Sequence, residues 1–358
     1  MPCDDSELNK FTGYFEAKEP GRKERAQAWA TAIGLQKVDG LTPSAYLIET
    51  AKQHIEGKLT QAQVRRRINN YYSVKHELFS HAADCEKCEE ADKVSERIVA
   101  IIHDGGFSFT PEYFLSLHKK LFKGILPHAG ELRHVNIKKH EWILKDDSVT
   151  YGDHASLKAS MARHFLDEKE FAYEGKSTAQ IIPHFARFIA QIWQIHPFTE
   201  GNTRTTAVFT IKYLRALGYP VTNNIFSENS WYFRNALVRA NYADYSKGVA
   251  RNWSYLEAFF RNLLLDGQNI LKSRTLLINT AANLPQSSKE PSRPSTKSEV
   301  INEAINEAIK NEPGINKPRL MKKFKKSRAT IERALAKLIA AQKVEHRGSK
   351  KTGGYWLR

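Results

Sequence analysis

Residues 185–218 read FARFIAQIWQIHPFTEGNTRTTAVFTIKYLRALG. The first part places apolar side chains at i, i+3, i+4, i+7 and i+8, the spacing of one buried stripe on a helix. The residues of this stripe are Phe185, Phe188, Ile189, Ile192 and Trp193. Residues 205–218 again have helical spacing and end in a glycine, where a C-cap is expected. The stretch therefore predicts two helices joined by a short loop at 196–204.

That loop combines a base, a carboxylate and an arginine around a glycine turn. Backbone N–H groups at a helix start are free, and with the helix dipole they favour phosphate, which predicts a phosphate cradle at Gly201, Asn202 and Thr203. Glu200 is a hard oxygen donor suited to Mg²⁺, and Arg204 is a cation suited to phosphates. His196, with an ordinary pKa of about 6.5, can accept a hydroxyl proton near neutral pH. On composition alone, a purely structural loop is the alternative.

Residues 196–204, HPFTEGNTR, resemble the signature of the Fic family, His-Pro-Phe-x-Asp/Glu-Gly-Asn-Gly-Arg. The resemblance extends over roughly residues 91–266 and includes GELR at 130–133. It implies a protein adenylyltransferase, a nucleotidyltransferase that moves AMP from Mg-ATP to a Ser, Thr or Tyr hydroxyl of a target protein. ATP and Mg²⁺ are the cofactors it implies.

In that family the histidine deprotonates the target hydroxyl, the acidic residue holds Mg²⁺, the Gly-Asn turn binds phosphate and the arginine contacts the pyrophosphate side. The resemblance places these roles on His196, Glu200, Gly201, Asn202 and Arg204. Thr203 would complete the nucleotide-binding turn.

Two positions depart from the family pattern. Thr203 stands where the signature has glycine, and Ala207 stands where many members carry a further arginine. A different nucleotide donor, such as UTP or GTP, is therefore an alternative to ATP. Tyr232 and Asn235 are candidate base-pocket residues, and the alternative there is an amphipathic core helix.

Residues 138–151 read KKHEWILKDDSVTY and predict a β-hairpin around the Lys-Asp-Asp turn. The resemblance implies that this hairpin is a flap on which the target protein docks. Strand addition at an exposed edge gives such docking a physical basis.

Residues 42–68 predict two helices, with Thr42 and Pro43 as cap and first-turn pair and Gly57 between the helices. The segment resembles the antitoxin-like restraint of some Fic enzymes, in which an inhibitory glutamate pairs with an arginine. That role would fall on Glu56, although the expected partner position is Ala207. The alternative is a helix-terminal glutamate in solvent.

The C-terminal end is strongly basic. Residues 298–358 hold 15 Lys and Arg against six Glu, a net charge of +9 out of the chain's +16. Three helices followed by two short strands predict a winged helix, with Arg328, Thr330 and Arg333 near DNA bases and Lys350 and Lys351 on phosphates. A protein-interaction module is the alternative.

The chain as a whole is predicted to be mainly α: an N-terminal antitoxin-like helical segment at 1–75, a Fic-fold catalytic bundle with its hairpin flap at 76–280, a linker at 281–297 and a winged helix-turn-helix domain at 298–358. A DNA-binding regulator with a sensor-like Fic domain is the competing interpretation.

The sequence also bears on metal binding and on location. Cys85 and Cys88 have CxxC spacing, for which zinc binding is weighed against incidental thiols on a polar helix. Neither a secretory signal nor an apolar run of about 20 residues is found. We therefore expect a cytoplasmic protein without a membrane partner.

Overall fold

The computed structural model describes residues 11–16, 19–78, 83–221, 224–278, 305, 308–309, 312–324, 328–340, 344–348 and 353–357. The chain divides into two compact units, residues 1–284 and 285–358. The predicted linker at 281–297 lies outside the described residues.

The first unit is helical. Its α-helices are α1 (Thr12–Phe15), α2 (Pro20–Gln36), α3 (Ala45–Ile55), α4 (Gln61–Leu78), α5 (Ala83–His103), α6 (Pro111–Phe122), α7 (Leu157–Lys169), α8 (Thr178–Ile195), α9 (Asn202–Ala216), α10 (Ile225–Asn241) and α11 (Ser254–Leu265). Short 3₁₀ turns are η2 (Lys37–Asp39), η3 (Trp142–Leu144), η4 (His154–Ser156), η5 (Tyr245–Lys247) and η6 (Ser273–Leu276). The expectation of a mainly α fold is confirmed.

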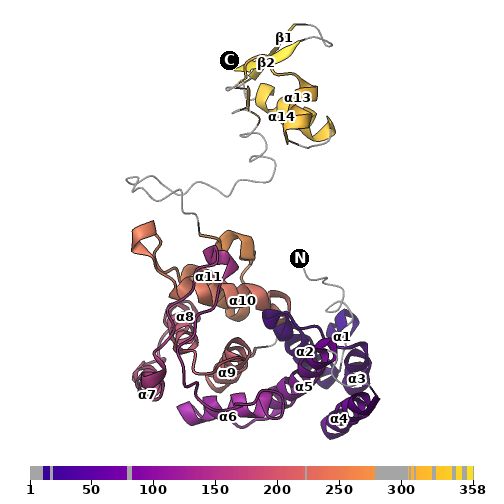
Figure 1. The fold of residues 1–358 in the computed structure, drawn as a ribbon, viewed down its shortest axis with the longest axis vertical. Helices are drawn as coiled ribbons and strands as arrows, with labels where there is room; N and C mark the ends of the chain where they lie inside the picture. Colours follow the sequence, from indigo (N-terminus) through magenta and orange to yellow (C-terminus); the bar gives the residue numbers. More distant parts are fainter. Residues whose placement is uncertain are drawn as a thin grey trace. The chain divides into compact units, whose positions relative to one another are not determined.

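Helix α9 is the centre of this unit. Figure 1 shows it inside a ring formed by α6, α8, α10, α2 and α5, and its residues from Asn202 to Leu214 are all buried. Polar side chains on this helix therefore form hydrogen bonds within the protein. Thr210 donates to the carbonyl of Thr206, and Lys212 donates to the carbonyl of Asp104. The N-terminus of α9 is consequently held rigidly by the core.

Helix α8 leads into the loop, as the sequence predicts. Ser177 and Gln180 form a capping box at its start. The predicted stripe of five apolar residues is buried, which confirms that interpretation. The helix ends at His196, whose backbone is left-handed (φ 49°, ψ 58°).

The N-terminal helices belong to the same compact unit as the loop. Helix α2 packs against α5 and α10, and the predicted border at residue 75 falls inside α4. The cap of α3 differs from the prediction: Ser44, not Thr42, accepts from the N–H of Leu47. Ser44 is held in turn by the Asp92 carboxylate, to which Tyr72 also donates.

The segment at 138–151 reverses direction, but it does not form two paired strands. A single antiparallel bridge joins Glu141 to Asp147, and η3 lies between them. The reason is burial: Ile143 and Leu144 are consecutive and both buried, whereas consecutive strand residues would point to opposite faces. A 3₁₀ turn brings both side chains into the core.

The second unit contains α13 (Lys317–Phe324), α14 (Arg328–Ala340) and an antiparallel pair of strands, β1 (Val344–Arg347) and β2 (Gly354–Leu357), with Val344 opposite Leu357. Its small core includes Ile305, Ile309, Leu320, Leu335 and Tyr355. Lys350 and Lys351 lie outside the described residues. The winged helix stays a prediction.

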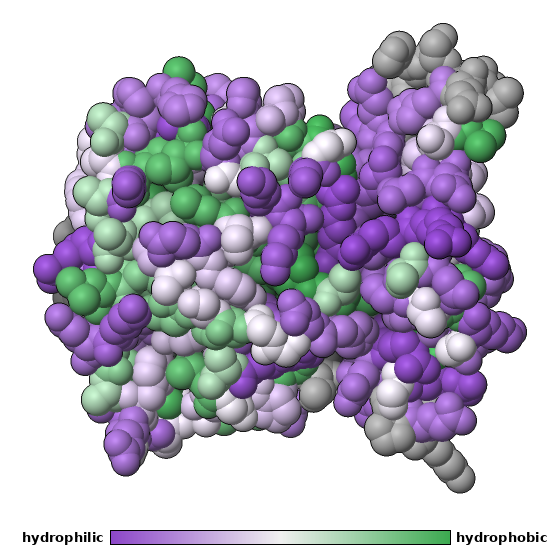
Figure 2. Space-filling model, turned by 90° about the horizontal axis from the view of Figure 1, so that it is seen from below, coloured by the Kyte–Doolittle hydropathy of each residue, from purple (hydrophilic) through white to green (hydrophobic). Residues whose placement is uncertain are grey.

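Figure 2 shows the first unit from the side of α6, at the bottom of Figure 1. Hydrophilic residues gather at the end that carries α3 and α4, where Arg65, Arg66 and Arg67 are exposed. Apolar residues are more frequent toward the other end. The basic run on α4 is thus a solvated face, and Arg65 pairs with Glu96.

We predict that Gly34→Ala destabilises the first unit. A Cβ on Gly34 would lie 2.4 Å from the backbone oxygen of Ser227, so α2 and α10 would have to separate. Overpacking of this kind costs about 1–3 kcal/mol, which outweighs the roughly 1 kcal/mol by which alanine favours a helix. Thermal unfolding would measure the loss. Gly13→Ala, with no atom within 4 Å of its new Cβ, is the matched control, and equal melting temperatures for the two variants would contradict the prediction.

Candidate active site

The loop from His196 to Gly201 closes on itself through Asn202. The Asn202 amide donates to the carbonyl of Phe198 (2.7 Å), and its side-chain oxygen accepts from the N–H of Phe198 (3.0 Å). Phe198 is buried and stacks on the ring of His118. The loop is therefore a rigid turn, anchored at its middle by a side chain from the first turn of α9.

Gly201 has a positive φ of 73° at the N-cap of α9. A Cβ at this position would lie 2.5 Å from the ring of Phe122. Only glycine fits this backbone conformation and this space. The glycine that the sequence assigns to the phosphate cradle therefore has a structural reason, and the N-terminus of α9 lies beside it as a group of free backbone donors.

His196 is buried, and the tautomer of its ring leaves Nε2 unprotonated and able to accept a proton. Its Nδ1 lies 3.1 Å from the carbonyl oxygen of Trp193, and because a carbonyl only accepts, Nδ1 carries the proton. Nε2 is then the acceptor, and no described residue gives it a hydrogen bond. The ring of Tyr151 lies 4.1 Å away, centroid to centroid. Burial lowers the pKa of His196 well below its ordinary value, and the charge of Lys139 lowers it further.

Two side chains position the loop through its backbone. The side chain of Arg133 donates from Nε to the carbonyl of His196 (2.8 Å). The backbone N–H of Arg133 donates to the carbonyl of Pro197. His118 accepts the N–H of Gly130 at Nδ1, so its Nε2 donates to the carbonyl of Glu200. Burial lowers the pKa of His118 to about 4, which keeps this tautomer neutral.

The sequence pointed to one of these two positioning residues. Arg133 lies in the quoted GELR stretch, whereas His118 lies in an amphipathic helix and carries no signal of its own.

The two departures from the Fic signature both have a packing role. Thr203 is buried, and its hydroxyl accepts from the indole N–H of Trp193 at 3.0 Å. Ala207 is fully buried. Thr203 thus joins α9 to the end of α8, and the second turn of α9 contributes no cation at position 207.

Arg204 is buried and held by acidic groups from two other elements. Its Nε lies 2.6 Å from Asp39 in η2, its Nη2 lies 2.6 Å from Glu90 in α5, and its Nη1 donates to Gln36. The guanidinium also lies over the ring of Phe122. The sequence gave no sign of these partners, because they come from segments far from the loop.

A cavity of about 760 Å³ opens beside this arginine. Its lining includes Asp39, Glu90, Lys139, Glu200, Gly201, Arg204, Glu228, Trp231 and Arg234. Glu200 is exposed to this space. One carboxylate with room for phosphates and water fits Mg²⁺, which in such sites uses one or two carboxylates together with substrate phosphates.

Three residues proposed from the sequence lie elsewhere. Tyr232 and Asn235 are buried and do not line the cavity; α10 presents Trp231 and Arg234 to it instead. Glu56 is held by the hydroxyl of Tyr14 and the ammonium of Lys58, each at 2.7 Å. The structure therefore brings His196, Glu200, Gly201, Asn202, Thr203 and Arg204 together and leaves these three apart.

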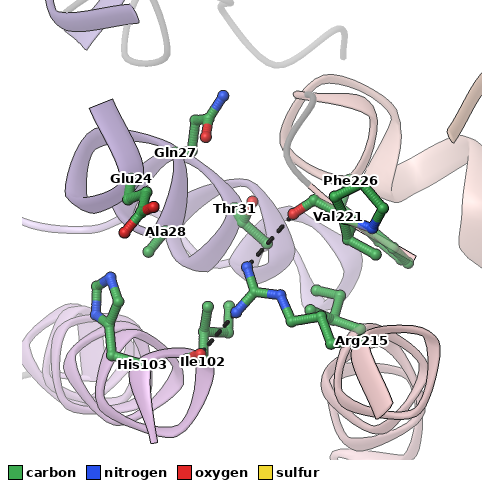
Figure 3. Close-up of a pocket in the computed structure, with 11 residues that line it drawn as sticks. Glu24, Gln27, Ala28, Thr31, Ile102, His103, Arg215, Val221 and Phe226 are labelled. Atoms are coloured by element: carbon green, nitrogen blue, oxygen red, sulfur yellow. Dashed lines mark hydrogen bonds between the residues drawn. The ribbon is translucent and has the colours of Figure 1, made fainter. Parts of the chain in front are cut away.

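A second cavity of about 330 Å³ lies between α2, α5 and α9 (Figure 3). Arg215 reaches into it and donates to the carbonyls of Ile102 and Val221. The first bond caps the C-terminal end of α5 and the second holds the segment between α9 and α10, so this arginine has a structural role.

The zinc hypothesis finds no support among the described side chains. They contain no group of three or more His, Cys, Asp or Glu placed to hold a metal ion. The side chain of Cys85 is not among them.

Part of the chain that includes the loop is similar to a known family. Residues 108–214 match the model of the Fic/DOC family. Over 141 residues the chain is 28% identical to the "Probable protein adenylyltransferase y4lH" of Sinorhizobium fredii (strain NBRC 101917 / NGR234), covering 38% of this chain and 67% of that protein.

Two solved structures are similar to this chain. A Fic family protein from Desulfovibrio desulfuricans G20 has a TM-score of 0.45 and 14% identity, with 99% of this chain and 94% of that chain covered. The N-terminal FIC domain of Bep8 from Bartonella sp. 1-1C has a TM-score of 0.40 and 14% identity, with 51% and 87% covered.

None of the helices in the described part of the chain has both the length and the apolar character needed to cross a membrane.

We predict that the His196 ring stays neutral well below pH 6.5. Because its folded pKa lies below the ordinary value, the unfolded chain takes up this proton first as the pH falls. Its contribution to stability is therefore complete above about pH 6.5 and is lost as the pH falls toward the folded pKa. NMR titration of the histidine rings, with His196→Asn to assign the signal, measures this pKa. A midpoint at or above 6.5 would contradict the burial argument.

Proposed function

We propose that this protein is a protein adenylyltransferase that transfers AMP from Mg-ATP to a Ser, Thr or Tyr hydroxyl of a target protein. The observation that carries the proposal is the unpartnered Nε2 of His196 on a rigid loop next to the N-terminus of α9. The similarity to a probable protein adenylyltransferase and the match to the Fic/DOC family support it.

In this reaction the target oxygen bonds to the α-phosphorus while the bond from that phosphorus to the bridging oxygen breaks, and pyrophosphate leaves. Nε2 of His196 accepts the hydroxyl proton. The N–H groups at the start of α9 bind phosphate oxygens, and Arg204 attracts the leaving pyrophosphate. Glu200 would hold Mg²⁺, which neutralises phosphate charge when bound.

Access to the base requires a movement. His196 is only 2% exposed, and Tyr151 lies over its ring. The target segment would enter where residues 138–151 reverse direction. Docking there is part of the proposal, and backbone pairing beside the Glu141–Asp147 bridge would supply it.

The same proposal includes restraint by the N-terminal segment. Asp39 and Gln36 belong to this segment and hold Arg204 directly, whereas the carboxylate of Glu56 is engaged by Tyr14 and Lys58. A carboxylate on the arginine competes with phosphate for the same donors, since both are anions that bind a guanidinium. Asp39 is therefore the better candidate for the restraining group.

We predict that His196→Asn lowers transfer by at least about 100-fold, as expected for loss of a general base. Asparagine tolerates the left-handed backbone at this position, so the fold should persist. The measurement is incubation with Mg²⁺, cell lysate and each α-labelled nucleoside triphosphate, followed by autoradiography, which also identifies the donor. Label that persists in the variant, or its absence from every donor with the wild-type protein, would contradict the proposal.

We predict that Asp39→Asn raises the labelling rate several-fold, because it removes the carboxylate charge 2.6 Å from Nε of Arg204 while Glu90 keeps the buried charge paired. Glu49→Gln, at an exposed site on α3, removes the same charge without touching the cavity and is the control. Glu56→Gly tests the other restraint in parallel. Activation by Glu56→Gly with no change in Asp39→Asn would refute the role assigned to Asp39.

DNA binding by residues 298–358 stays a prediction. Arg328 is exposed and pairs with Glu332, and Lys317 contacts the same carboxylate. These contacts lower the pKa of Glu332.

A further inference from the structure

The two arginines that line the cavity beside the loop are already neutralised. Arg204 is paired with Asp39 and Glu90. Arg234 forms a two-point ion pair with the buried carboxylate of Glu141, at 2.6 and 3.0 Å. A polyphosphate entering this cavity therefore meets guanidinium groups whose charges are balanced by protein carboxylates.

Lys139 lines the same cavity and differs from both arginines. Its backbone N–H donates to Ser148, but within the described part of the chain its ammonium has no hydrogen-bond or ion-pair partner. The side chain is half-buried. Its charge acts on Asp39 and Glu200 and also on His196, so it is coupled to the groups of the proposed reaction.

An ammonium withdrawn from water without a partner costs free energy. In agreement, burial lowers the pKa of Lys139. A multiply charged anion in the cavity would remove this cost by giving the ammonium a partner. No carboxylate of the described residues forms an ion pair with it: Asp39 lies against Arg204, and Glu141 pairs with Arg234.

Helix α9 does not supply a second cation for the phosphates. The side chain at position 207, in the second turn of α9, is a fully buried alanine methyl, so α9 supplies Arg204 but no further charge at that position. The pyrophosphate side of a triphosphate carries most of its negative charge. A second cation there must come from another element, and Lys37, Lys87 and Lys139 line the cavity. Lys37 already interacts with another group and Lys87 is exposed, which leaves the half-buried Lys139.

We infer that the Lys139 ammonium binds the pyrophosphate side of the nucleoside triphosphate, opposite Arg204. This inference rests on the proposed function for the identity of the ligand. Its chemistry is charge recognition, so Lys139 is expected to contact the β- and γ-phosphate oxygens and to leave the α-phosphate to the start of α9.

The test compares Lys139→Met with wild-type full-length protein by calorimetric titration with ATP and with AMP. Methionine keeps the apolar stem and removes the charge. Because a hydrogen bond to a charged group contributes about 10- to 100-fold in affinity, we expect ATP to bind Lys139→Met about 10- to 100-fold more weakly and AMP to bind it as it binds wild type. Lys139→Arg should restore most of the ATP affinity.

Lys138→Met is the matched control, since Lys138 is the exposed neighbour on the same segment. It should bind ATP as wild type does. We also expect the ligand-free Lys139→Met to melt no lower than wild type, because the substitution removes an unpaired half-buried charge. A structural role for Lys139 would instead lower the melting temperature and would weaken ATP and AMP binding alike.

Unchanged ATP affinity in Lys139→Met, or equal losses for ATP and AMP, would overturn the inference even where His196-dependent labelling confirms the transferase. Lys139-dependent ATP binding without any transfer would support the inference and overturn the proposed reaction. No ATP binding by wild type would overturn the inference.

Discussion

The buried guanidinium of Arg204 is the group around which the site is built. It connects η2, α5 and α9, because Asp39 and Glu90 must approach it from two sides to balance its charge. A buried charge left without a partner is unfavourable, so the N-terminal helices cannot leave without exposing or unbalancing this charge. The same pairing that orders the fold thus places carboxylate charge where a phosphate would bind the guanidinium.

The loop itself is shaped mostly through its backbone. Arg133 binds the carbonyl of His196, His118 binds the carbonyl of Glu200, and Asn202 pairs with Phe198. None of these contacts uses the side chain of His196 or Glu200. As a result both residues are oriented while Nε2 of His196 and the carboxylate of Glu200 are not used in holding the loop, which is what the proposed proton transfer and phosphate binding would require.

Sequence patterns predicted the parts of the fold that depend on local spacing. The stripe on α8 and the glycine turn before α9 are in place because helical periodicity and positive φ are properties of short segments. Local patterns failed where burial decided the conformation: Ile143 and Leu144 are both drawn into the core, so a 3₁₀ turn replaces the expected hairpin. Likewise, α10 turns Trp231 and Arg234 toward the cavity instead of Tyr232 and Asn235.

By itself the sequence determined the helical framework, the loop at 196–204 and the set of candidate site residues within it, since nine consecutive positions hold both the turn and the side chains of the proposed chemistry. Tertiary structure alone decided the charge balance of the site. The charged groups come from separate segments: Asp39, Glu90, Glu141, Arg234 and Lys139. Their electrostatic coupling depends on their distances in space, which no sequence spacing encodes.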